Sequence, residues 1–196
     1  MSTDIPDAEL WASAAGGSEA AFGQLFDRHA ATVWNHCFRL TGSWAEAEDL
    51  TSTVFLQAWR RRAEVRITEG GLRAWLLAVA GNSARTERRS LARRLRLATR
   101  VGPPPATADH ADEVAGRVDD ERRMAAVLAA VQRLPRAERE ALQLCVWGEV
   151  SYAAAAEVLG LEVGSVRARV SRARARLTRL LAEPAPPSRL TAEESR

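Results

Sequence analysis

Apolar residues recur every three or four positions along most of this chain, the spacing of helices that each bury one face. Gly, Pro and Ser interrupt the pattern and divide it into eight predicted helices, at about 7–15, 18–40, 43–62, 72–100, 120–134, 135–147, 151–159 and 163–181. Ser43, with Glu46 three positions later, has the spacing of a capping box at one of these starts. The alternating β-branched runs that mark strands are absent from the sequence. We therefore predict an all-α fold.

The longest interruption separates the fourth and fifth predicted helices. Residues 101–117, VGPPPATADHADEVAGR, combine three consecutive prolines with small and acidic residues, which is typical of a flexible linker. We expect two small helical domains, at 1–100 and 118–182, on either side of it. The closing segment 183–196, rich in Pro, Glu and Ser, is expected to be a disordered tail.

The last two predicted helices form a helix-turn-helix pattern, with Gly160 providing the tight turn between them. Apolar positions at helical spacing should face the core, namely Val166, Val170, Ala173 and Leu177. A recognition helix reads base edges with the outward residues of its first turns. Here those residues are Ser165, Arg167, Ala168, Arg169, Ser171 and Arg172.

Charge is unevenly distributed along the chain, although the overall formal charge is only +3. Residues 59–100 hold twelve Arg against three acids, a net +9, and residues 165–181 hold six Arg and no acid, a net +6. The segments between them are acidic. Two separate basic blocks suit two contacts with one long anion such as nucleic acid. The alternative is that each block is a solvated helix face.

The first basic block also contains aromatic and amide side chains. Trp75, Asn82, Arg85, Arg88 and Arg89 fall on one predicted helix. An aromatic ring beside a basic face is suited to binding unstacked bases. In the alternative interpretation, Trp75 belongs to the core and the arginines are solvated.

Other function classes receive little support from the sequence. Cys37 and Cys145 are far apart in apolar surroundings, and the three histidines do not cluster with acids or cysteines, so we expect no metal, no cofactor, no disulfide and no enzyme activity. The opening MSTDIPDAEL is not a secretion signal, and no apolar run reaches the ~18 residues of a membrane span. We expect a cytoplasmic protein with no membrane partner.

The chain resembles the extracytoplasmic-function sigma factors of bacterial RNA polymerase from about Phe22 to Leu181. The resemblance rests on the order and spacing of AEDLTSTVFLQAW, of WLLAVAGN with arginines after it, of LPRAEREALQL, and of SYAAAAEVLG followed by SVRARVSRARARL. It implies an alternative sigma factor that binds core polymerase, directs it to specific promoters and helps to melt the minus-ten element. Binding, with no bond chemistry, would carry this function.

The resemblance also implies a role for each segment. Asp49, Ser52 and Thr53 would contact the clamp coiled coil of the polymerase β′ subunit, and the second domain would meet the β flap. Trp75 and Asn82, with the loop 65–71 and the arginines that follow, would lie near single-stranded minus-ten bases. The outward residues of the last helix would read the minus-thirty-five element. An anti-sigma protein is a further candidate partner.

The sequence departs from the family pattern at four positions. Gly81 stands where the family often has Arg, Thr86 where an acid is usual, Ser52 where Gln is usual, and Ala155 where a larger apolar residue is common. These departures bear on promoter strength and on affinity for the polymerase. A rival hypothesis keeps the helix-turn-helix but makes the protein a DNA-binding regulator that never joins polymerase.

Overall fold

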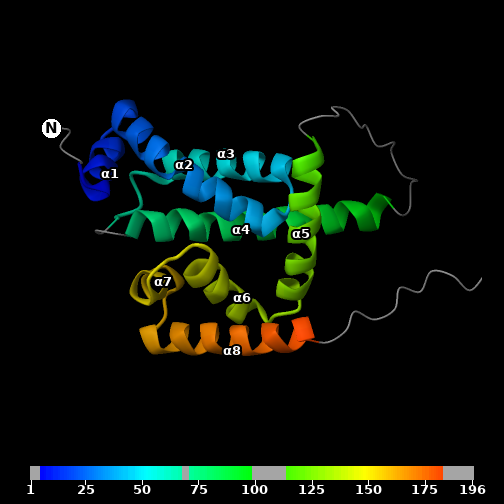
Figure 1. The fold of residues 1–196 in the computed structure, drawn as a ribbon. Coiled ribbons are helices and arrows are strands. Elements are labelled where there is room, and N and C mark those ends of the chain that lie inside the picture. Colours follow the sequence, from blue (N-terminus) through cyan, green and yellow to red (C-terminus); the bar gives the residue numbers. More distant parts are fainter. Residues whose placement is uncertain (1–4, 68–70, 99–113, 183–196) are drawn as a thin grey trace, which may run out of the picture.

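The computed structural model describes residues 5–67, 71–98 and 114–182, and within these ranges the regular structure is entirely helical (Figure 1). The helices are α1 (Asp7–Ala15), α2 (Glu19–Thr41), α3 (Trp44–Arg61), α4 (Gly71–Ala98), α5 (Val114–Gln132), α6 (Arg136–Leu142), α7 (Tyr152–Leu159) and α8 (Val163–Ala182), with a π-helical turn η1 (Gln143–Trp147) continuing α6. The predicted all-α class is confirmed. The expected tail, 183–196, lies outside the described residues.

Helices α1 to α4 form the first bundle, in which α2 packs on α1, α3 and α4, and α3 also packs on α4. The predicted start at Ser43 is confirmed, because its hydroxyl accepts from the Glu46 N–H at 3.5 Å. Helix α2 begins in the same way at Ser18. It ends where Gly42 turns the chain at φ 73°, a left-handed conformation that costs glycine little.

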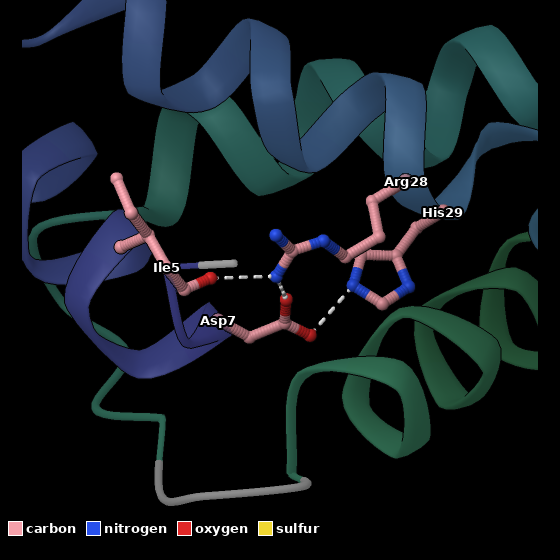
Figure 2. Close-up of polar contacts among 4 residues, drawn as sticks. All are labelled: Ile5, Asp7, Arg28 and His29. Atoms are coloured by element: carbon pink, nitrogen blue, oxygen red, sulfur yellow. Dashed lines mark hydrogen bonds and ion pairs between the residues drawn. The ribbon is translucent and has the colours of Figure 1, made fainter. Parts of the chain in front are cut away.

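A group of polar contacts joins the start of α1 to α2 (Figure 2). Asp7, at the start of α1, receives the Arg28 Nη1 donor at 2.5 Å and lies 2.6 Å from His29 Nε2. The same Arg28 nitrogen donates to the Ile5 carbonyl at 2.9 Å. His29 is buried, so this carboxylate satisfies a ring nitrogen that would otherwise lose its contact with water.

Helices α6 to α8 form the helix-turn-helix unit, and α5 crosses from the first bundle to it (Figure 1). Ser151 caps α7 through the Ala154 N–H, and Gly160 makes the predicted turn at φ 64°. The predicted inward stripe is largely correct: Val166, Val170 and Ala173 are buried, and Leu177 is half-buried.

One boundary differs from the sequence-based expectation, and one helix end has an unexpected geometry. Helix α5 begins at Val114, within the segment expected to be linker, and about six residues before the predicted start. Its first residues include Gly116, which the sequence pattern favoured as loop. The helical stretch expected to end at Trp147 does so, but its last five residues form a π turn that leaves a wider ring of backbone hydrogen bonds. Residues 99–113 of the expected linker lie outside the described part of the chain.

The two expected domains share one hydrophobic core. Leu77 and Ala80 of α4 belong to the same buried cluster as Leu144 of η1 and Ala155 of α7. Full burial of a leucine side chain stabilises the folded state by about 1.5–3 kcal/mol. The separate cores that the division into domains implied are therefore joined through α4.

Two arginines of the first bundle donate hydrogen bonds to main-chain carbonyl groups at the end of η1. Arg39 donates to the Trp147 carbonyl at 2.5 Å, and Arg73 donates to the Gly148 carbonyl at 2.8 Å. These guanidiniums satisfy carbonyl groups at a helix end that has no further intrahelical donor. A positive charge there also interacts favourably with the helix dipole.

His36 of α2 is the most deeply buried polar side chain of this interface. It is 2 % exposed, and neither ring nitrogen has a hydrogen-bond partner in the described part of the chain. Burial, together with the charges of Arg39 and Arg73, lowers the pKa of His36 from the ordinary 6.5 to about 4. The ring is therefore neutral at pH 7, with one nitrogen able to donate and one able to accept.

Glycine-to-alanine substitutions at two positions should change stability in opposite directions. A Cβ on Gly81, inside α4, meets nothing within 4 Å, so Gly81→Ala should stabilise the protein by about 0.5–1 kcal/mol through helix propensity. A Cβ on Gly148 lies 2.6 Å from Leu77 Cδ1 and 2.7 Å from the Leu144 oxygen, so Gly148→Ala should cost about 1–3 kcal/mol. Thermal unfolding of both variants beside the parent measures this. Equal stability of the parent and Gly148→Ala would contradict the close packing of η1 on α4.

Acid should destabilise the protein through His36. Since its folded pKa lies below its unfolded value, the unfolded chain takes up the proton first, and stability falls as the pH drops from 6.5 towards about 4. The full loss is about 3 kcal/mol. Chemical denaturation between pH 7.5 and 4 should show a shallower loss for His36→Leu than for the parent. Parallel curves for the two proteins would mean that His36 is already accessible to protons in the folded state.

Candidate nucleic-acid interface

The outer face of α8 carries the residues predicted to read the upstream element. Helix α8 presents this face because Val166 and Val170 anchor its opposite side in the core. Of the six predicted residues, four are exposed and two are half-buried: Ser165, Arg167, Ser171 and Arg172 are exposed, and Ala168 and Arg169 are half-buried. The structure thus brings the whole predicted set onto one accessible surface.

Some arginines of α8 pair with Glu138 of α6, and others have no acidic partner among the described residues. This buried carboxylate lies 3.1 Å from Arg176 Nε and 3.6 Å from Arg172 Nε. Arg167 instead lies over the ring of Tyr152, 5.7 Å from its centroid, and neither it nor Arg169 has an acidic partner among the described residues. The start of α8 therefore presents uncompensated positive charge, whereas the middle is tied to α6. Sequence reasoning missed Glu138, because its contact joins residues 34 and 38 positions apart.

The second predicted set lies on α4, with its members in different surroundings. Asn82 is exposed, and its Oδ1 accepts from Arg85 Nη2 at 2.9 Å. Arg85 also forms an ion pair with Glu140 of α6 at 2.7 Å, and Arg88 donates to the Leu40 carbonyl at the end of α2. Arg89 is exposed and has no ion-pair partner in the described ranges.

Trp75 of the same predicted set has mainly aromatic and apolar surroundings. Its ring is half-buried and packs edge-on against Trp11, with 5.5 Å between centroids and 64° between planes. The Trp11 Nε1 donates to the Val65 carbonyl, so α1 and the start of the loop after α3 support the same aromatic pair. Trp75 therefore packs partly against the core, as the alternative interpretation expected, and its role in binding stays a prediction. Residues 68–70 of that loop lie outside the described residues.

Electrostatic crowding characterises the arginines of α4. Burial lowers the pKa of Arg85; Glu140 opposes that effect, while Arg136, Arg89 and Arg139 add to it. Burial likewise lowers the pKa of Arg88, and Arg139 of α6 lowers it further. These guanidiniums are held close to like charges and partly out of water, which strengthens their attraction for an anion.

The predicted polymerase-contact residues lie on the outer face of α3. Asp49 and Ser52 are exposed and Thr53 is half-buried. Leu56, one turn further on, is 48 % exposed and extends this face with an apolar side chain. Sequence reasoning missed Leu56, although its spacing of seven from Asp49 places it on the same side of a helix.

An acidic patch accompanies this face. Burial raises the pKa of Glu87 on α4, and the nearby carboxylates Glu46 and Asp49 raise it further. The acidic patch is thus formed by residues of both α3 and α4, which the sequence alone did not indicate. It gives this part of the surface a negative charge.

Neither a metal centre nor a membrane span is found among the residues that the structure describes. In those ranges, no group of three His, Cys, Asp or Glu side chains lies close enough to hold a metal ion. No helix in them is both long and apolar enough to cross a bilayer.

Comparison with known families assigns both halves of the chain. Residues 25–94 match the family model for Sigma-70 region 2, and residues 124–177 match that for Sigma-70, region 4. The first match covers α3 and most of α2 and α4, and the second runs from α5 into α8. The predicted DNA-binding arginines of α4 and those of α8 therefore lie within the matched regions.

Similar proteins agree with this assignment. The chain is 32 % identical over 166 residues to the ECF RNA polymerase sigma factor SigL of Mycobacterium tuberculosis, which covers 81 % of this chain and 88 % of the relative. It is 34 % identical over 176 residues to SigM of the same species, covering 89 % and 84 %.

Solved structures share the fold. CnrH, in complex with the cytosolic domain of CnrY, has a TM-score of 0.64 at 28 % identity over 89 % of this chain and 96 % of that one. RpoE from Bartonella quintana, in complex with the anti-sigma factor NepR, has a TM-score of 0.58 at 26 % identity over 82 % and 96 %. The chain belongs to the extracytoplasmic-function sigma factors of bacterial RNA polymerase.

Proposed function

We propose that this alternative sigma factor, which directs RNA polymerase to promoters, holds promoter DNA through two separate arginine faces and acts by binding alone. The observation that carries this proposal is the uncompensated basic surface at the start of α8, in a helix-turn-helix that matches Sigma-70, region 4. Phosphate contacts from both faces supply affinity that depends on salt. Two weak readers on one chain raise each other's effective concentration.

The start of α8 reads the minus-thirty-five element in this proposal. Arg167 and Arg169 are free to meet base edges, and a guanidinium can pair with guanine in a bidentate manner. Arg172, exposed but near Glu138, lies at the boundary of the reading surface. Arg176 serves structure, because its guanidinium donates to the same buried carboxylate.

The exposed side of α4 holds the opened minus-ten strand. Asn82 offers an amide for the edge of an unstacked base, and Arg88 and Arg89 offer charge for its phosphates. The accessible part of the Trp75 ring can support a base by stacking. A base captured in this way offsets unstacking, which costs a few kcal/mol.

Binding to polymerase uses the outer face of α3 in this proposal. Asp49, Ser52, Thr53 and Leu56 meet the clamp coiled coil of the β′ subunit, and the second domain meets the β flap. Both similar structures hold a sigma-like chain in complex with a partner, and in RpoE that partner is the anti-sigma factor NepR. An anti-sigma protein is therefore a proposed partner of this chain, and the cytoplasm is its proposed location.

In this proposal, the two packed domains separate before the minus-ten strand binds to α4. Asn82 and Arg85 line a cavity together with Val158 and Leu159 of α7. The second domain therefore stands beside the surface assigned to minus-ten DNA. Core polymerase, by binding each domain separately, would favour the open population over the closed one.

Substitutions on α8 should weaken recognition of the upstream element. Arg167→Ala and Arg172→Ala should each lower affinity for a specific promoter about tenfold, because one lost guanidinium–base pair is worth about 1–3 kcal/mol. Arg179→Ala removes the same charge from the far end of α8 and is the matched control. Fluorescence anisotropy at fixed ionic strength measures all three. If the control loses as much affinity as Arg167→Ala, the assigned reading face is wrong.

Substitutions on α3 should separate polymerase binding from DNA binding. The double variant Asp49→Ala, Thr53→Ala should bind core polymerase at least tenfold more weakly, because it removes two contacts from one face. The double variant Glu19→Ala, Gln24→Ala, at exposed positions on α2, is the control. Competition for labelled core polymerase provides the measurement. Unchanged polymerase affinity in the α3 variant would show that polymerase binds another face of the protein, whereas no binding by the parent itself would favour a DNA-binding regulator that works without polymerase.

A further inference from the structure

The interface between α4 and the second domain contains a cavity of about 230 Å³ with mixed chemistry. Its apolar lining comes from Leu77 and Ala78 of α4 and from Val158 and Leu159 of α7. Buried His36 lines it with two unpartnered ring nitrogens. The rest of the lining is mostly polar, with Asn82, Arg85, Arg136, Glu140 and Gln143. Apolar side chains together with convergent polar groups are typical of small-molecule sites.

A second cavity, of about 240 Å³, opens between α4 and α6. It is lined by five arginines, three from the first bundle and two from the second: Arg85, Arg88, Arg89, Arg136 and Arg139. Glu140 is the one acid in this lining, and it is shared by Arg85 at 2.7 Å and Arg136 at 2.8 Å. Glu140 positions these two guanidiniums across the interface but leaves a net charge of +4 in the cavity.

The remaining guanidiniums of this cavity are only partly engaged. Arg88 donates to the Leu40 carbonyl, and Arg139 donates to the side chain and the carbonyl of Gln132. None of these acceptors carries a charge. An anion with several oxygens would relieve the repulsion among the five arginines, and guanidinium pairs with phosphate are among the stronger hydrogen bonds in proteins.

The two cavities are neighbours, because the lining of both includes Gly81, Arg85, Arg136, Glu140 and Gln143. Gly81 contributes to this space, since a Cβ there would meet nothing within 4 Å. We propose that this interdomain site binds a nucleoside polyphosphate, with its base in the cavity beside His36 and its phosphates among the five arginines. Neutral His36 offers a donor or an acceptor to the polar edge of the base.

Binding of such a ligand would depend on whether the two domains are packed together. Both domains contribute arginines, so the site is complete only when they are packed together. By linkage, the ligand stabilises that arrangement to the extent that it binds the closed form better than the open one. It also occupies Arg85, Arg88 and Arg89, so it competes with minus-ten DNA; this second effect rests on the proposed function, whereas binding itself does not.

Isothermal titration of the full chain at about 0.15 M salt tests the site. The probes are ATP, GTP, inorganic tripolyphosphate and adenosine. We expect at least one nucleotide to bind with 1:1 stoichiometry and at least tenfold more tightly than tripolyphosphate. Adenosine should bind at least tenfold more weakly than ATP, because it lacks the groups that meet the arginines.

Variants outside the assigned promoter surfaces identify the site. Arg136→Gln should weaken nucleotide binding about tenfold, whereas Arg122→Gln, a charge-matched change at an exposed position on α5, should leave it unchanged. Gly81→Leu should weaken it by filling the space at the junction of the two cavities. Arg136→Gln keeps the test decisive if the Gly81 variant fails to fold.

Three results would overturn the proposal. The first is no saturable binding of either nucleotide. The second is equal affinity for tripolyphosphate and nucleotides, which would mean that the arginines attract any polyanion. The third is an equal loss in Arg136→Gln and Arg122→Gln. Promoter binding by the unliganded protein is measured separately, so failure here is distinguishable from failure of the proposed function.

Discussion

The structure depends on the burial of α4 from two sides. Helices α2 and α3 pack on it within the first bundle, and η1 and α7 pack on it from the second. Leu77 is fully buried, and at Gly148 the backbone of η1 comes so close that a Cβ would stand 2.6 Å from the Leu77 side chain. Larger residues at Gly148 would separate the two surfaces. This close contact is part of the shared core through which α4 joins the two domains.

The packing of the two domains determines which polar groups meet at their interface. Once the domains are packed, the carbonyl groups at the end of η1 require donors, which Arg39 and Arg73 provide. Packing also brings the arginines of α4 towards those of α6, with Glu140 between them. These arginines are crowded in the packed arrangement. In our proposals the same side chains bind promoter DNA and an anion, so closure, anion binding and promoter access would be linked through them.

Features encoded by local sequence could be predicted. The cap at Ser43 needs only residues three apart, the turn at Gly160 needs one glycine, and the buried stripe of α8 follows from helical spacing. The exposure of Ser165, Arg167 and Arg172 follows from the same spacing. Each of these predictions depends on residues that are neighbours on one helix or turn, so no knowledge of tertiary packing was needed.

Contacts between distant segments could not be predicted. Glu138 meets Arg176, and Glu140 meets Arg85, only because α6 lies against α8 and α4. The spacing of apolar residues along a helix does not indicate which distant side chains will meet. The early start of α5 was not predicted either, because its first residues read as loop by composition. Propensity is a weak guide where tertiary packing decides.

Transcription in vitro would show whether this chain gives RNA polymerase a new promoter specificity. Purified core polymerase from a related bacterium would transcribe genomic fragments with and without the protein, and the new transcript ends would be sequenced. We expect discrete new start sites that share two upstream elements at a fixed spacing. No new start sites, from protein that still binds duplex DNA, would contradict this expectation.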